Sequence, residues 1–283
     1  MGARASATTR QQRLGVEVRR MRTSAGMSAE FAAGLLGVDR GAISHIESGV
    51  RAISPARVRT LACNCDCQDA GYVEALVKMA TVGRRGWWER YRGSLPQGML
   101  DIAELEEHAV HMRAAYSMHI PGLLQTSDHA MAVFRVVIPQ LPEHEVALRL
   151  AHRVERQNVL EGADATPFVA IVHEAALRMQ FGGREVAKAQ LRHVLERSEQ
   201  GNVSVLVIPF AAGAFPGAGQ TVLYAEGPVA QLDTVQVDSS HGPDFLHAEA
   251  QLAKYRAHLD WMERIALSSA ASRDFIRDIS NDL

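Results

Sequence analysis

Residues 27–54 constrain the fold of this chain most, because they contain two short segments with helical amphipathicity separated by a glycine. Ser28 is placed to cap the first helix, and Gly37 can adopt the left-handed conformation that ends it. Asp39 can cap the second helix, and Gly49 stops it. The apolar residues expected to share the inner face of the first helix are Phe31, Ala32, Leu35 and Leu36. The pattern predicts two short helices that cross closely at a tight turn.

The second of these helices has two different faces. Ile43 and Ile46 would point into a core, whereas its polar and small residues face outward. A helix that leaves such residues exposed is typical of the recognition helix of a DNA-reading helix-turn-helix. Apolar spacing from Leu14 to Met21 predicts a helix upstream, and Ser54-Pro55 begins another downstream. Residues 1–82 are therefore expected to form an all-α bundle of about five helices.

The pattern G-V-x-x-x-x-I-S-x-I-E-x-G from Gly37 to Gly49 resembles the Xre family of lambda-repressor-like helix-turn-helix regulators. The resemblance implies that Glu47 pairs with Arg22 and that the outward residues contact an operator in double-stranded DNA. The candidate DNA-contacting residues are Ser28, Arg40, Gly41, Ser44, His45 and Arg51. Ala29 stands where the family commonly has Gln, so one contact is missing. A homodimer is expected, because one short recognition helix reads only a few base pairs.

The charge is divided unevenly along the chain. Through Arg92 there are 15 Lys and Arg against 8 Asp and Glu, a net +7, and the remainder has 15 against 24, a net −9. A basic front suits phosphate contacts, whereas DNA would repel the acidic back. Arg4, Arg10 and Arg13 suggest either a mobile arm along the DNA backbone or a disordered tail. The chain lacks a signal peptide and any apolar run near 20 residues, so a cytoplasmic protein is expected.

Composition changes around Gly83-Arg84-Arg85-Gly86, where we place the boundary between residues 1–82 and 83–283. The second part is expected to be an α+β domain with a small sheet, so the chain as a whole is α+β. Helical spacing is found at 100–117, 144–161, 184–199, 244–268 and 270–279. Apolar β-branched runs at 168–172, 203–208, 221–225 and 229–237 predict strands.

Several motifs of the second part resemble the domain that follows an Xre module in actinobacterial WhiJ-like regulators. They include W-W-x-x-Y at 87–91, P-G-L-L-Q-T at 121–126, R-x-x-R-Q at 153–157 and E-A-A-L-R at 174–178. Those regulators are often encoded beside a small partner protein and have been likened to antitoxins. The resemblance thus implies a domain that binds a small partner protein or senses a signal. It weakens after Tyr224, where residues 231–243 depart from the family pattern.

The candidate residues for binding a partner or ligand include arginines and aromatic residues, and each kind has an alternative, structural role. The arginines could clamp a carboxylate, or could instead form salt bridges with neighbouring helices such as the one that carries Glu174. The aromatic residues could anchor a ligand, or could hold the linker in place. The full set is Trp87, Trp88, Tyr91, Gln125, Arg153, Arg156, Gln157 and Glu174.

No complete catalytic signature occurs, so we expect no enzyme activity and no cofactor. His173-Glu174 and His144-Glu145 each begin an H-E-x-x-H motif but lack its second histidine. Two groups could suggest a metal: Cys63, Cys65 and Cys67, which lack a fourth ligand, and Glu104, Glu107, His108 and His111, which could instead be the solvated face of one helix. We expect no metal. The alternatives for function are a receptor for a small-molecule effector and an antitoxin-like protein that sequesters a small partner.

Overall fold

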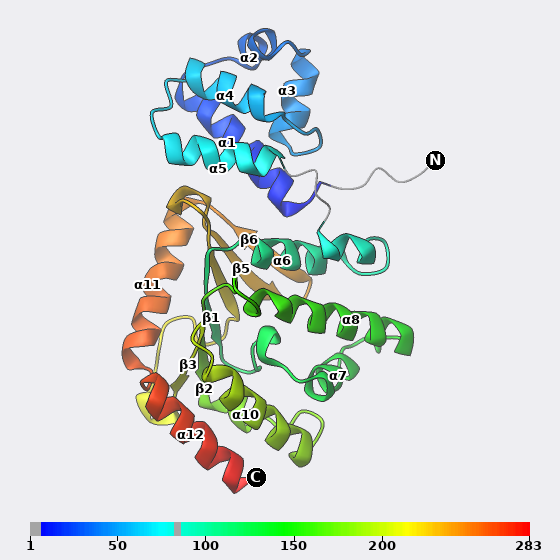
Figure 1. The fold of residues 1–283 in the computed structure, drawn as a ribbon, viewed down its shortest axis with the longest axis vertical. Helices are drawn as coiled ribbons and strands as arrows, with labels where there is room; N and C mark the ends of the chain where they lie inside the picture. Colours follow the sequence, from blue (N-terminus) through cyan, green and yellow to red (C-terminus); the bar gives the residue numbers. More distant parts are fainter. Residues whose placement is uncertain (1–6, 82–85) are drawn as a thin grey trace. The chain divides into compact units, whose positions relative to one another are not determined.

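A computed structural model describes residues 7–81 and 86–283 of the chain, which divides into two compact units, Met1–Glu89 and Arg90–Leu283. Figure 1 shows the first unit in blue to cyan and the second in the remaining colours. The expected boundary at residues 82–83 and the Gly83–Arg85 run lie outside the described residues. Among the described helices, none combines the length and apolar character needed to cross a lipid bilayer.

The first unit is an all-α bundle, as the sequence indicates. Its described helices are α1 (Thr9–Ser24), α2 (Ala29–Leu36), α3 (Arg40–Glu47), α4 (Pro55–Asn64) and α5 (Ala70–Thr81). Side chains cap all five, through Thr8 in a capping box, Ser28, Asp39, Ser54 and Asp69. Gly37 ends α2 in the left-handed conformation with φ 60°. The core contains Val18, Ala32, Ile43, Ile46, Val58, Leu61 and Leu76.

Two expectations for the first unit are wrong. The buried face of α2 consists of Ala32, Ala33 and Leu36, so Phe31 points outward and is 63% exposed. The pattern misplaced it because Phe31 and Leu35 are i, i+4 neighbours that share a face of their own. The proposed N-terminal arm also fails for Arg13, which lies within α1 and pairs in the core with Glu17 at 3.2 Å. Arg4 lies outside the described residues.

The second unit is built on one mixed sheet of six strands, in the order β3-β2-β1-β4-β5-β6. β1, β2 and β3 run parallel, and β4, β5 and β6 each pair antiparallel with their neighbours. The strands are β1 (His111–Tyr116), β2 (Phe168–His173), β3 (Val203–Ile208), β4 (Val222–Glu226), β5 (Thr234–Ser239) and β6 (Gly242–Leu246). Together with the all-α first unit, this sheet confirms the α+β class.

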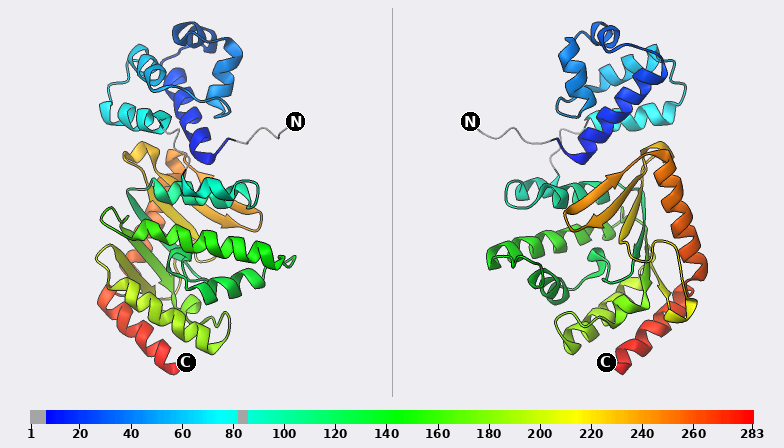
Figure 2. Two further views of the ribbon diagram at one scale, coloured as in Figure 1. Left: turned by 45° about the vertical axis from the view of Figure 1, so that its right-hand side comes forward. Right: turned by 180° about the vertical axis from the view of Figure 1, so that it is seen from behind.

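Helices cover both faces of the sheet, with α11 on one face and α6, α8 and α10 on the other (Figure 2). The helices are α6 (Gln97–Glu107), α7 (Ser127–Arg135), α8 (Glu143–Arg156), α9 (Glu174–Arg178), α10 (Arg184–Ser198), α11 (Glu249–Ile265) and α12 (Ser269–Asp282). Short 3-10 turns include η1 (Trp87–Tyr91), η2 (Gly122–Leu124) and η3 (Gln157–Leu160). One core cluster contains Met112, Phe168 and Val205 with residues of α10 and α12, and the other contains Ile171 and Tyr224 with residues of α11. Neighbouring residues of one strand therefore pack into cores on opposite faces of the sheet.

Three predicted elements of the second unit need correction. The helix expected at 100–117 ends at Glu107, and residues 111–116 form β1, which lies between β2 and β4. The expected helix 244–268 begins with strand β6, and the strand expected from 229 begins at Thr234 after a 3-10 turn. Met and Ala are good helix formers, but pairing on two sides places Met112, Ala114 and Ala115 in a strand.

Candidate functional site

The exposed face of α3 is the candidate DNA-reading surface. Asp39 caps this helix by accepting from the Ala42 amide at 2.8 Å, and Ala42, Ile43 and Ile46 are buried. The side chains on the opposite face are therefore presented to solvent in a fixed orientation. The exposed residues there are Arg40, Gly41, Ser44 and His45, the four that the sequence places outward.

Two further candidate residues lie beside this helix pair. Ser28 Oγ accepts from the Phe31 amide at 3.1 Å, so it caps α2, while its hydroxyl hydrogen can still be donated to a phosphate. Exposed Arg51 lies near the N-terminal end of α3, with its Nη1 4.0 Å from Asp39 Oδ2. An arginine at this place suits contact with the DNA backbone.

A buried ion pair and a close helix contact hold α3 in position. Arg22 donates through Nε and Nη2 to the two carboxylate oxygens of Glu47, at 2.5 and 3.1 Å, as the resemblance implies. The hydrogen bond to Glu47 raises the pKa of Arg22. Gly15 of α1 packs so closely on α3 that a Cβ there would lie 2.6 Å from the Ile46 and Glu47 carbonyl oxygens. A glycine inside a helical pattern is the feature of the sequence that could have indicated this contact.

In the second unit, several motif residues converge on the turn at 121–126. Gln157 Nε2 donates to the Gln125 carbonyl at 2.7 Å, and Gln190 Nε2 donates to the Leu124 carbonyl at 2.6 Å. Gln125 is buried, with its Nε2 on the Ile120 carbonyl, so its Oε1 is oriented to accept from Arg153 Nη1 at 2.5 Å. Gln125, Arg153 and Gln157, three of the candidates for binding a partner or ligand, thus lie together.

The two arginines of α8 have different partners. Arg156 is buried and donates to both carboxylate oxygens of buried Glu106, at 2.8 and 2.5 Å. Arg153 lies over the Phe134 ring, 4.9 Å from its centroid, and forms no ion pair within the described residues. Burial, together with the nearby charge of Arg156, lowers the pKa of Arg153 to about 10. Arg156 therefore forms the internal salt bridge that we considered, but with Glu106 rather than with the helix of Glu174.

Two histidines that the sequence did not single out lie beside Arg153. His129 is 1% exposed, and neither of its ring nitrogens has a hydrogen-bond partner among the residues that the structure describes. The Phe181 ring contacts both His129 and exposed His119, with its centroid 5.4 Å from that of each histidine. Burial lowers the pKa of His129 to about 4, and the charges of His119 and Arg153 act in the same direction. His129 is therefore neutral at pH 7.

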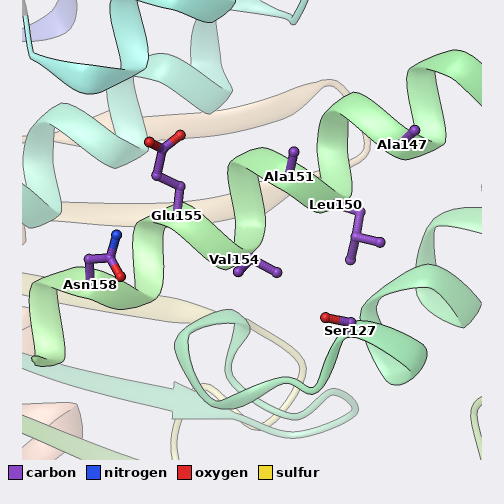
Figure 3. Close-up of a pocket in the computed structure, with 7 residues that line it drawn as sticks. All are labelled: Ser127, Ala147, Leu150, Ala151, Val154, Glu155 and Asn158. Carbon is purple, nitrogen blue, oxygen red and sulfur yellow. The ribbon is translucent and has the colours of Figure 1, made fainter.

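A groove of about 560 Å³ lies between α7 and α8 (Figure 3). Leu150 and Val154 point from α8 toward Ser127 at the start of α7 in this view. Its lining residues are Ser127, Ala147, Leu150, Ala151, Val154, Glu155 and Asn158. Val154 is 43% exposed, so the groove presents apolar surface to solvent.

The remaining candidates do not form part of this surface. Trp88 and Tyr91 are only 4% and 8% exposed, and Tyr91 donates to Glu155 Oε2 at 3.0 Å. Their burial opposes the expected role as an exposed aromatic anchor. Trp87 is half-buried and contacts Trp88 edge to face. Glu174 is buried and accepts from the Phe210 amide at 2.8 Å and from Arg178 at 2.7 Å, so it serves the local structure.

The residues considered as metal ligands are also placed by the fold. Cys63 lies in the last turn of α4 and is exposed, and all three cysteines are free thiols. His111 lies on β1 with its Nδ1 2.9 Å from Glu226 Oε1, whereas Glu104 and Glu107 lie on α6. Within residues 7–81 and 86–283, no group of three or more His, Cys, Asp or Glu is arranged to hold a metal ion.

Comparison with known proteins finds one family match in each of the two units. Residues 13–71 match the profile of a helix-turn-helix domain, which indicates a DNA-binding regulator, and residues 99–278 match that of a domain of unknown function, DUF5753. No curated protein and no solved structure matches the chain. The second match covers more than half of the chain. The chain therefore belongs to the DUF5753 family, and it carries a helix-turn-helix domain before that domain.

Proposed function

We propose that the protein is a sequence-specific transcription regulator of the Xre type that binds its operator as a homodimer. The observation that carries this proposal is the outward face of α3, where Arg40, Ser44 and His45 are exposed while Ile43 and Ile46 anchor the helix in the core. Arginine can donate to both acceptors of a guanine edge in the major groove. The basic balance of the chain through Arg92 supports binding to a polyanion.

Selection from random DNA followed by binding measurements tests this proposal. Arg40→Ala should weaken binding to the selected site by about 1–3 kcal/mol and relax specificity at one position. Arg59→Ala is a matched control, because Arg59 is exposed in the same unit but pairs with Glu74. Equal losses on selected and random DNA would make Arg40 a phosphate contact. Unchanged binding by the Arg40 variant would refute the assignment of α3.

For the second unit we infer a role in receiving a signal, either a small partner protein, as in WhiJ-like regulators, or a small molecule. Its acidic composition, its apolar groove and the polar cluster around Arg153 support recognition rather than turnover. An antitoxin-like protein that sequesters a small partner is the second candidate. The groove between α7 and α8 favours it, because exposed Ala147, Ala151 and Val154 could receive an apolar side chain.

Purification of the tagged protein from its own cells, followed by mass analysis, distinguishes these roles. A stoichiometric small protein that is lost from Val154→Asp but kept by Val110→Asp would support partner binding in the groove, since both valines are exposed. The effect of that protein on operator affinity then separates regulation from sequestration. A regulator must bind the DNA-competent and incompetent states with different affinities.

A further inference from the structure

The cluster around Arg153 contains a cation that forms no ion pair among the described residues, although the charges of Glu106 and Asp238 reach it. Arg156 has the carboxylate of Glu106, whereas Arg153 has only the neutral oxygen of Gln125 and the ring of Phe134. The Arg153 Nε is buried without a hydrogen-bond partner, and the bond to Gln125 occupies Nη1. The edge of the guanidinium formed by Nε and Nη2 is thus left for another acceptor.

His129 supplies a second, independent observation. It is almost fully buried, and both of its ring nitrogens lack partners, although buried polar atoms are nearly always paired. Its ring contacts Phe181, which also contacts exposed His119. The site therefore combines buried His129 and half-buried Arg153 with exposed His119.

We propose that Arg153, His129 and His119 form a binding site for the carboxylate of a small organic acid. A carboxylate matches the free Nε and Nη2 edge of Arg153 in a bidentate pair, and an imidazole N–H can donate to it. Burial is the main cause of the lowered pKa of Arg153 and of His129, and an anion would offset the smaller contribution of the neighbouring positive charges. This inference rests on the proposed function, because it names the chemical class of signal that the second unit would receive.

The orientation of Arg153 supports a prepared site. Gln125 is fixed by its bond to the Ile120 carbonyl, and Gln157 holds the main chain of the same turn. A Cβ at Gly122 would lie 3.0 Å from Arg153 Nη1, so the glycine leaves room for the guanidinium. The neighbouring residues thus hold Arg153 in one place before any ligand arrives, which lowers the entropic cost of binding.

The test titrates the full-length protein with sodium acetate at constant ionic strength, with chloride as the balancing anion. Calorimetry and the ring NMR signals of the histidines are the measurements. We expect saturable binding of one acetate per chain, together with a shift of the His129 signals. Arg153→Gln should weaken this binding about tenfold or more, and Arg149→Gln should not change it, because Arg149 lies on the same helix but pairs with Glu145. In chloride, Arg153→Gln should be folded and at least as stable as the wild type, since it removes a charge that lacks a carboxylate.

Several results would overturn the proposal. The first is that the wild type shows no saturable response to acetate, and the second is that Arg153→Gln binds acetate equally well. The third is that the protein binds inorganic phosphate but not acetate. Measuring operator affinity with and without acetate distinguishes the carboxylate site from the proposed reception of a signal. Acetate binding that depends on Arg153 but leaves operator affinity unchanged would support the carboxylate site and contradict signal reception. Loss of acetate binding alone leaves the DNA-binding proposal untouched.

Discussion

At the scale of single residues, the protein buries charged groups with different degrees of compensation. Arg22 and Glu47 are 11% and 10% exposed and satisfy each other in a bidentate pair. Arg156 and Glu106 form a similar pair in the second unit, next to Arg153, for which no ion pair is found among the described residues. Burying a charge without a counter-charge lowers the stability of the protein. Neutralising one partner of a buried pair should therefore lower the free energy of unfolding, whereas neutralising an unpaired buried charge should not.

Glu47→Gln should destabilise the protein by about 3 kcal/mol, because it leaves Arg22 buried without a counter-charge. Urea denaturation at pH 7, monitored by circular dichroism, measures the free energy of unfolding. Glu74→Gln is the matched control, since the Arg59–Glu74 pair has the same bidentate geometry but both side chains are more than half exposed. We expect no measurable change for that variant. A similar loss for both variants would place the Arg22–Glu47 pair in an effectively aqueous environment.

Buried His129 should make the stability depend on pH. Its pKa is lowered to about 4 by burial, whereas an unfolded histidine titrates near pH 6.5. Between these values the unfolded state binds the additional proton. The contribution of neutral His129 to the free energy of unfolding is thus fully present above about pH 6.5. It is lost as the pH falls toward 4, by up to about 3 kcal/mol. His129→Gln should flatten the decline, measured as urea unfolding at pH 7.0, 6.0 and 5.0, and the exposed His45→Gln should behave like the wild type.

At the scale of secondary-structure elements, the position of the recognition helix depends on how closely α1 approaches α3. Gly15 faces the carbonyl oxygens of Ile46 and Glu47, and Gly49, with φ 76°, packs against the backbone of Gln12. Backbone atoms cannot move aside as a flexible side chain can. The two glycines therefore set the distance between α1 and the end of α3.

Gly15→Ala should destabilise the first unit by about 1–3 kcal/mol, because the added methyl group forces the two helices apart. Gly34→Ala is the matched control. Gly34 also lies inside a helix, but a Cβ there meets no atom within 4 Å. That variant should be stabilised by about 0.5–1 kcal/mol through helix propensity alone. Thermal unfolding distinguishes the two cases, and a gain in stability for Gly15→Ala would contradict the close contact.

The elements also show what the sequence can and cannot predict. Helix caps at Ser28, Asp39 and Ser54 act between neighbours in the chain, so they were predictable, and the pairing of Glu47 with Arg22 followed from family resemblance. The strand at 111–116 was not predictable, because its helix-forming residues become a strand only by pairing with β2 and β4, which come much later in the chain. For the same reason the contact of Arg153 with Gln125 was not predictable, since the sequence offers the two only as separate candidates, and His129 was found only after α7 was placed.

At the scale of the whole molecule, the charge is distributed between two parts with opposite balance. The chain through Arg92 has a net +7 and the rest a net −9, although the total is only −2. DNA affinity from phosphate contacts falls as salt rises, because binding releases condensed counterions. The salt dependence of binding therefore reports the number of basic groups that reach the DNA, independently of the overall charge.

The proposed homodimer gives a specific expectation for that salt dependence. On a full operator with two half-sites about one helical turn apart, both protomers contact phosphates, whereas a half-site engages one. The slope of log K against log salt should therefore be about twice as steep on the full operator. Arg51→Ala should make both slopes shallower, by about one unit per engaged protomer, whereas Arg59→Ala should leave them unchanged. Fluorescence anisotropy between about 50 and 200 mM salt gives these slopes. Equal slopes on the half-site and the full operator would show that one protomer makes all the phosphate contacts, and the dimer would then have to be abandoned.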